Sequence, residues 1–99
     1  MKRTDLHMHT WSSDGTWSPV VLLERLKSLN IEIFSVTDHD TIESSETIKK
    51  LISHENLTFI PGVEVSTTFK GREYHLTAYH YDRQNKAFID LIHSNDNLR

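Results

Sequence analysis

The feature that most constrains the fold of this chain is the alternation of short apolar segments with stretches of helical periodicity. Strands are predicted where short apolar runs occur, at 2–7, 31–36, 57–68 and 72–80. Helices are predicted where apolar residues recur at helical spacing, over about 18–29, 44–53 and from 84 onward. The order β-α-β-α-β-β-α predicts an α/β fold with a largely parallel sheet. In such folds, ligands bind at the carboxyl ends of the strands.

Cap and turn residues agree with these boundaries. Ser18-Pro19 is typical of a helix N-cap followed by proline in the first turn. Pro61-Gly62 predicts a break or bend in the third strand, and Lys70-Gly71 predicts a hairpin turn. A parallel sheet this short would leave an open edge, and no cap follows the last helix at Arg99. We therefore expect a chain that is cut short, with a second copy or the missing C-terminal segment covering the edge.

Composition narrows the class of protein. The 99 residues suit one small domain, and a formal net charge of −3 argues against a basic surface that holds nucleic acid. The absence of cysteine excludes a disulfide scaffold and thiolate metal sites. No apolar run is long enough to span a membrane, and the first residues do not lead into the apolar core of a signal peptide. A cytoplasmic protein is the expectation.

Ionisable residues gather where the first two predicted strands end. His7 and His9 are two residues apart, so both side chains can face the same ion. His39 follows the second strand directly, between Asp38 and Asp40, where ionisable groups are costly unless they are paired or metal-bound. The alternative is that the two aspartates cap the following helix and that His39 is incidental.

Three further candidates lie near the same end of the predicted sheet. Asp14 occurs in Ser-Asp-Gly, for which a simple surface turn is the alternative. Glu64 stands between two valines, and a carboxylate there could bridge two cations, unless it simply faces solvent. His75 lies in the fourth strand, where a core or edge histidine is the alternative reading.

The pattern as a whole is more specific than any single motif. Each of the four predicted strands delivers a His, Asp or Glu near one end of the sheet. These ligands suit zinc, manganese or iron better than copper(I). The other three histidines fit no such pattern, so we expect His54 and His93 to be solvated and His80 to be unconnected with the site. The residues alone predict a multinuclear metal hydrolase.

Five separated motifs between residue 5 and about residue 82 resemble, in order and spacing, the N-terminal motifs of the PHP (polymerase and histidinol phosphatase) family. They are Asp-Leu-His-Met-His-Thr, Ser-Asp-Gly-Thr, Thr-Asp-His-Asp-Thr, Pro-Gly-Val-Glu-Val-Ser and Tyr-His-Leu. The resemblance implies that residues 1–99 are the N-terminal portion of a distorted (β/α)7 barrel, without its later strands. Asp14 makes the chain similar to the branch that acts on nucleoside monophosphates, bisphosphonucleotides or short RNA 5′ ends.

The resemblance also implies up to three divalent metal ions, Mn, Zn or Fe, at one face of the barrel. The implied ligands are His7, His9 and Glu64 for the first metal, Glu64 and His75 for the second, and Asp14 and His39 for the third. The family's remaining ligands, a later histidine and a C-terminal Asp-x-His pair, have no counterpart in this sequence. We therefore expect these 99 residues alone to hold metal partially or not at all.

The implied activity is hydrolysis of small phosphorylated substrates, namely phosphomonoesters of nucleotides or short oligonucleotides, by a metal-activated water. Asp38 is a candidate for orienting one of the ligands. Two alternatives are a non-catalytic PHP-like module of a larger DNA replication protein and a histidinol-phosphatase-like enzyme. A third is an amidohydrolase on a similar barrel, although no lysine stands at the position of Glu64 to form a bridging carbamate.

Overall fold

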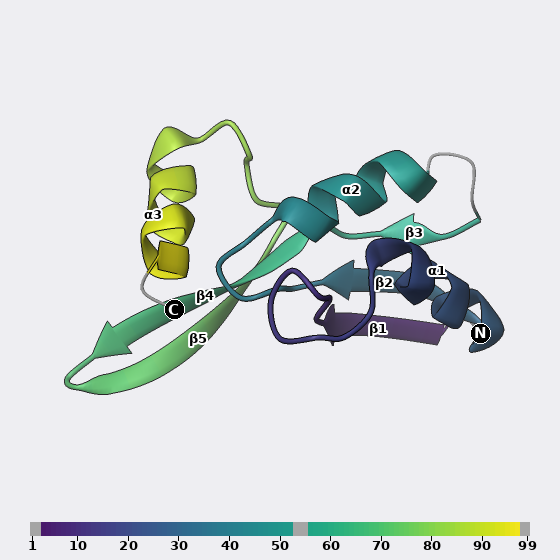
Figure 1. Ribbon diagram of the computed structural model, residues 1–99, viewed down its shortest axis with the longest axis horizontal. Coiled ribbons are helices and arrows are strands. Elements are labelled where there is room, and N and C mark those ends of the chain that lie inside the picture. The colour runs from purple at the N-terminus through teal and green to yellow at the C-terminus, as the bar shows by residue number, and fades with distance from the viewer. Residues whose placement is uncertain (1–2, 53–55, 98–99) are drawn as a thin grey trace.

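The computed structural model describes residues 3–52 and 56–97, and within them strands and helices alternate as a mixed α/β fold (Figure 1). This confirms the predicted fold class. The elements in chain order are β1 (Arg3–Met8), α1 (Pro19–Ser28), β2 (Ile31–Val36), α2 (Glu43–Leu51), β3 (Thr58–Phe59), β4 (Gly62–Phe69), β5 (Arg72–Tyr79) and α3 (Lys86–Asn97).

The strands form a parallel sheet and an antiparallel hairpin. The parallel sheet has the order β1-β2-β3, and β4 pairs with β5. A single parallel bridge between His39 and Glu64 continues the pairing of β2 with the chain that follows β3. In Figure 1 the hairpin accordingly extends away from the parallel sheet, beginning beside the carboxyl ends of β1 and β2. The prediction of a largely parallel sheet holds for β1 to β3, whereas the hairpin is antiparallel.

The third predicted strand divides into β3 and β4, as Pro61 indicated. Proline has no N–H to donate to a sheet, so the ladder is interrupted there. The segment nevertheless stays beside β2, because Ile60 donates its N–H to the Phe34 carbonyl at 2.9 Å. The interruption lets β4 leave the parallel sheet after Glu64 and pair with β5.

The predicted hairpin turn is also present. Lys70 and Gly71 both have positive φ angles, of 51° and 79°. Two consecutive left-handed residues give a two-residue turn whose twist matches the flanking strands. Gly71 suits this position because it lacks a Cβ atom.

Helices α1 and α2 pack with the parallel sheet around one apolar core. Ser18 accepts a hydrogen bond from the Val21 N–H at 3.3 Å and caps α1, as predicted. The buried members of this core are Leu22, Leu23, Leu26, Phe34, Val36 and Ile48. Leu29, predicted to continue the apolar stripe, is 51% exposed because it is the C-cap beyond the last turn.

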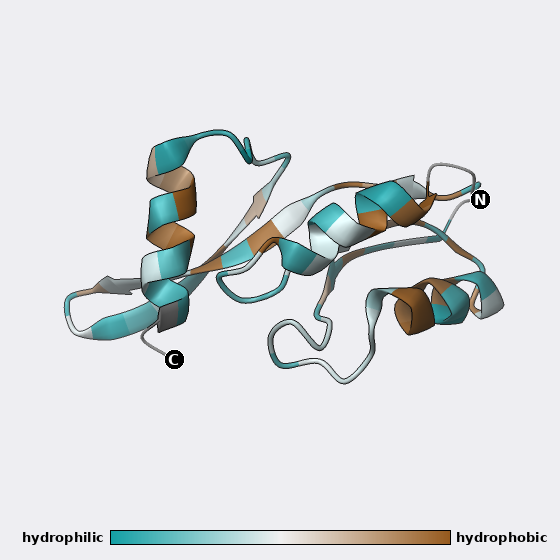
Figure 2. Cartoon of the chain, turned by 45° about the horizontal axis from the view of Figure 1, so that its top comes forward, coloured by the Kyte–Doolittle hydropathy of each residue, from teal (hydrophilic) through white to brown (hydrophobic). Residues whose placement is uncertain are grey.

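Helix α3 packs on the hairpin and forms a second, smaller core. Ile92 from α3 and two valines from β4, Val63 and Val65, are its buried members. Hydrophobic and hydrophilic residues alternate along α3 in Figure 2, as expected of an amphipathic helix that covers one face of a sheet. Strand β5 is exposed over most of its length and pairs, within the described residues, with β4 alone.

A polar cluster ties α2 to the segment after β5. The Tyr81 hydroxyl donates to Glu46 at 2.6 Å, and Lys49 and Arg83 lie 2.8 and 3.3 Å from the same carboxylate. Burial raises the pKa of Glu46, but these hydrogen bonds and positive charges outweigh it and hold the pKa below its ordinary value of 4.5. Glu46 therefore stabilises the fold in its ionised form.

None of the helices in the described part of the chain is both long and apolar enough to cross a membrane.

Candidate metal centre

Two histidines come from the carboxyl end of β1. His7 lies in the strand, and His9 lies one residue beyond its end. They are two residues apart in extended chain, so their side chains lie on the same face. Their rings are stacked, with centroids 5.3 Å apart. Both Nε2 atoms approach Glu64 Oε1, at 2.7 Å from His7 and 3.3 Å from His9. Two imidazoles therefore converge on one carboxylate oxygen.

The segment after β2 runs beside the start of β4. The Glu64 N–H donates to the Asp38 carbonyl, and the Asp40 N–H donates to the Glu64 carbonyl, both at 3.0 Å. These bonds fix the backbone of Glu64 on both sides and bring His39 next to it. This parallel bridge explains why His39 and Glu64, which are 25 positions apart in sequence, share one site.

Glu64 is the buried centre of the group, with 6% of its side chain exposed. Its second oxygen, Oε2, lies 3.1 Å from His39 Nδ1 and 2.8 Å from His75 Nδ1. His75 reaches this position from β5. The two oxygens of Glu64 thus face different pairs of imidazoles, His7 and His9 on one side and His39 and His75 on the other.

Asp14 reaches the group from the loop between β1 and α1. One oxygen makes a short contact with His9 Nδ1, and the other lies 3.1 Å from His39 Nε2. Burial raises the pKa of Asp14, but the hydrogen bond and positive charge of His9 and the charge of His39 outweigh it and lower the pKa. Asp14 is therefore ionised at neutral pH and available as an anionic ligand.

Gly15 allows this loop to fold back against the end of β1. Its N–H donates to the Thr10 carbonyl at 2.9 Å. A Cβ atom at Gly15 would lie 2.7 Å from the His9 carbonyl carbon, closer than real Cβ atoms approach. The absence of a side chain at Gly15 thus brings Asp14 within reach of His9.

The structure brings all six candidate side chains together, in three groups whose potential ligand atoms lie within 4.8 Å of one another. The groups are His7, His9 and Glu64; His9, Asp14 and His39; and His39, Glu64 and His75. His9 and His39 each belong to two groups. In both rings one nitrogen faces Asp14 and the other faces Glu64. The groups therefore overlap more than the sequence-based allocation, which gave each histidine to one metal.

The donor set fits divalent cations. His39 is buried, and its Nδ1 atom makes no hydrogen bond although it lies 3.1 Å from Glu64. A buried nitrogen that faces a carboxylate without hydrogen bonding is costly unless something else satisfies it. A cation held between nitrogen and oxygen would do so, and imidazole and carboxylate suit manganese, zinc and iron.

Asp38 is hydrogen bonded to residues that adjoin two of the candidate ligands. It is buried and accepts hydrogen bonds from the Thr10 N–H at 2.5 Å, the Thr10 hydroxyl at 2.6 Å and the Ser13 hydroxyl at 2.8 Å. Thr10 and Ser13 are the neighbours of His9 and Asp14. The helix-cap alternative does not hold for α2, whose N-cap is Ile42 with no side-chain cap bond.

The remaining histidines lie apart from the three groups or outside the described residues. His93 is exposed on α3, and His80 is exposed after β5 with a positive φ of 55°. His54 lies outside the described residues. Sequence reasoning missed Glu73, whose Oε1 atom lies 3.2 Å from His75 Nε2. Its position two residues before His75 on the same strand face was the available signal.

A cavity of about 410 Å³ opens beside the group. Its wall includes Asp14, His39 and His75 of the candidate centre and the hydroxyl residues Ser12 and Ser13. This size falls within the range of small-ligand sites. A small polar molecule could therefore reach the candidate ligands directly.

Comparison with known proteins agrees with this arrangement. The chain is 32% identical over 98 residues to a 5′-3′ exoribonuclease of Haemophilus influenzae, covering 99% of this chain and 36% of that protein. It is 27% identical over 82 residues to a 3′,5′-nucleoside bisphosphate phosphatase of Chromobacterium violaceum, covering 83% of this chain and 29% of that one. The chain thus spans about a third of the length of these relatives.

A solved structure and a family model give the same result. A Bifidobacterium adolescentis protein proposed to be a metal-dependent phosphoesterase superposes with a TM-score of 0.89 at 26% identity, covering 99% of this chain and 34% of that one. The sequence model of the PHP domain matches residues 5–98, a span that includes the whole candidate centre. The chain belongs to the PHP domain family.

Proposed function

We propose that this chain carries the larger part of the metal centre of a phosphoesterase that hydrolyses phosphomonoesters of nucleotides or short oligonucleotides. The observation that carries the proposal is the orientation of Glu64. One of its oxygens faces His7 and His9, and the other faces His39 and His75. A carboxylate that offers one oxygen to each of two cations is typical of sites where a pair of metals clamps a phosphate.

The three groups of side chains are the proposed cation sites. His7, His9 and Glu64 would hold one ion, and His39, Glu64 and His75 a second. Asp14 would hold a third with a nitrogen from His9 or His39. Manganese, zinc or iron fits these ligands, and further ligands from outside these residues would complete each site.

Bound divalent cations would supply two things here, a lowered pKa for water and neutralisation of phosphate oxygens. The protein's own contribution is binding and orientation. Asp14 and Glu64 are the only carboxylates among the six candidate side chains, so divalent cations held there would be only partly neutralised by their own ligands. The bound cations would attract the phosphate dianion, and the Ser12 hydroxyl in the cavity wall could donate a hydrogen bond to it.

The relatives support a nucleotide as the substrate class, because one is named for a nucleoside bisphosphate and another for RNA. The cavity of about 410 Å³ has room for a mononucleotide or the end of a strand. These are the substrates that the test should compare.

The proposal is tested on the purified full-length protein stripped of metal and reloaded with Mn²⁺. Phosphate release is measured from a 3′,5′-bisphosphonucleotide, a short 5′-phosphorylated RNA and histidinol phosphate. We expect Mn²⁺-dependent release from the first or second substrate, abolished by Glu64→Gln. Release from histidinol phosphate alone, or Mn²⁺-independent release that survives Glu64→Gln, would contradict it.

A further inference from the structure

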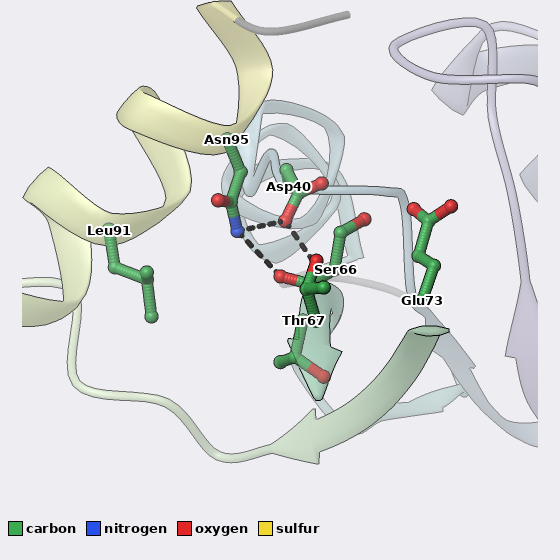
Figure 3. A pocket seen from close by; sticks show the side chains of 7 residues that line it. Asp40, Ser66, Thr67, Glu73, Leu91 and Asn95 are labelled. Carbon is green, nitrogen blue, oxygen red and sulfur yellow. Dashed lines mark hydrogen bonds between the residues drawn. The ribbon is translucent and has the colours of Figure 1, made fainter. Parts of the chain in front are cut away.

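A second cavity, of about 400 Å³, is lined by Asp40 and by residues of β4, β5 and α3 (Figure 3). Asp40, Ser66 and Asn95 meet in its wall and are joined by hydrogen bonds. Asp40 is 1% exposed, so a carboxyl side chain is buried directly after His39. Its hydrogen bonds reach one strand, β4, and one helix, α3.

Asp40 forms hydrogen bonds with the backbone of β4 at and near Glu64. Its N–H donates to the Glu64 carbonyl at 3.0 Å, and its Oδ1 atom accepts from the Ser66 N–H at 2.9 Å. Asp40 is therefore hydrogen bonded to β4 at two positions, on either side of Val65. It does so with a φ of 53°, a conformation that side chains rarely adopt and that Asp and Asn tolerate best.

Asn95 joins the same contact from α3. Its Nδ2 atom donates to Asp40 Oδ1 at 3.0 Å and to the Ser66 carbonyl at 2.9 Å (Figure 3). Ser66 is the register partner of His75 across the hairpin. A displacement of Ser66 would therefore move His75 on the neighbouring strand as well as Glu64 on its own.

We propose that Asp40 and Asn95 are positioning residues for the cation site formed by His39, Glu64 and His75. They hold β4 in the register that aims Glu64 Oε2 and His75 Nδ1 at the same point. Docking of α3 thereby supports this site through Asn95, while the site of His7 and His9 lies at the end of β1. The inference rests on the proposed function, because it concerns the affinity of a cation at that centre.

The test compares Asn95→Ala with Asn85→Ala in the full-length protein. Asn85 accepts from the Phe88 N–H at 3.0 Å in the first turn of α3, so its loss weakens the helix without touching Asp40. We expect Asn95→Ala to lower the affinity of one Mn²⁺ ion by about 10–100-fold, the usual effect of losing an orienting partner. Asn85→Ala should leave all Mn²⁺ affinities near wild type.

Two further readouts separate positioning from general stability. Hydrogen exchange of the Ser66 amide in the metal-free protein should be faster in Asn95→Ala than in Asn85→Ala. Asp40→Asn should retain Mn²⁺ binding better than Asp40→Ala, because asparagine keeps an acceptor oxygen and tolerates a positive φ.

The outcomes are distinguishable. Equal Mn²⁺ affinities in wild type and Asn95→Ala, or equal losses in Asn95→Ala and Asn85→Ala, would overturn the inference and leave the proposed function intact. Failure of the wild type to bind Mn²⁺ would overturn both.

Discussion

Substitution of Gly15 by alanine should damage the metal centre through the backbone. A Cβ atom at this position would lie 2.7 Å from the His9 carbonyl carbon and 2.9 Å from the Thr10 oxygen, and real Cβ atoms essentially never come within 3.0 Å. The clashing atoms are backbone, so the loop and the end of β1 must separate. Overpacking of this kind costs about 1–3 kcal/mol. In a domain of this size, that lowers the melting temperature by at least about 4 °C.

The same displacement should weaken metal binding, because His9 is part of two of the three groups. Metal ligands must be held to within about 0.5 Å of their productive positions. The assay is thermal unfolding of the metal-free protein together with Mn²⁺ titration of the same sample. Thr16→Ala, an exposed change in the same loop, is the control. A Gly15→Ala variant with wild-type stability and Mn²⁺ affinity would show that the loop tolerates a side chain at this position and that the close approach does not set the metal centre.

Three other predictions follow from the contacts. Glu64→Gln should reduce bound Mn²⁺ more than His75→Ala, since Glu64 belongs to two groups and His75 to one; titration calorimetry giving the reverse order would argue against a bridging carboxylate. His93→Ala should leave metal content unchanged, because His93 is exposed on α3, and a loss measured by elemental analysis would show that the wrong histidines were chosen. Glu46 has a lowered pKa in the folded protein. Its contribution to the free energy of unfolding is therefore present above the pKa of the unfolded state and is lost as the pH falls through the pKa of the folded state. Chemical denaturation should therefore show Glu46→Gln less stable than wild type at pH 7, with the difference shrinking below about pH 4.5; a gap that stays constant down to pH 3 would contradict this.

The fold could be predicted where local signals and periodicity agree. Ser18-Pro19 marks the start of α1, and Pro61 marks the division between β3 and β4. Which apolar residues at the helix ends are exposed could not be predicted in the same way. Leu29 follows the helical period of α1 but lies outside its last turn, so periodicity alone placed it in the core. The antiparallel pairing of β4 with β5 was predicted from the hairpin turn at Lys70-Gly71, whereas the order of the elements alone indicates a largely parallel sheet.

The gathering of His7, His9 and His39 was predictable, because parallel strands that end at one edge bring their last residues together. Glu64 joins them through its bridge to His39, and His75 through the pairing of β5 with β4. The sharing of His9 and His39 between groups was not predictable, since it depends on ring orientation in three dimensions. Nor was the link from Asn95 to Asp40, which joins residues 55 positions apart. Such contacts depend on how α3 docks, and short-range sequence patterns do not encode that.

Anomalous diffraction from crystals of the Mn²⁺-loaded full-length protein can show whether Glu64 serves two cation sites. We expect two anomalous peaks, each within coordination distance of a different oxygen of Glu64. One peak should be shared with His7 and His9, and the other with His39 and His75. Peaks that contact the histidines without touching Glu64, or a single ion held by one of its oxygens, would contradict the account.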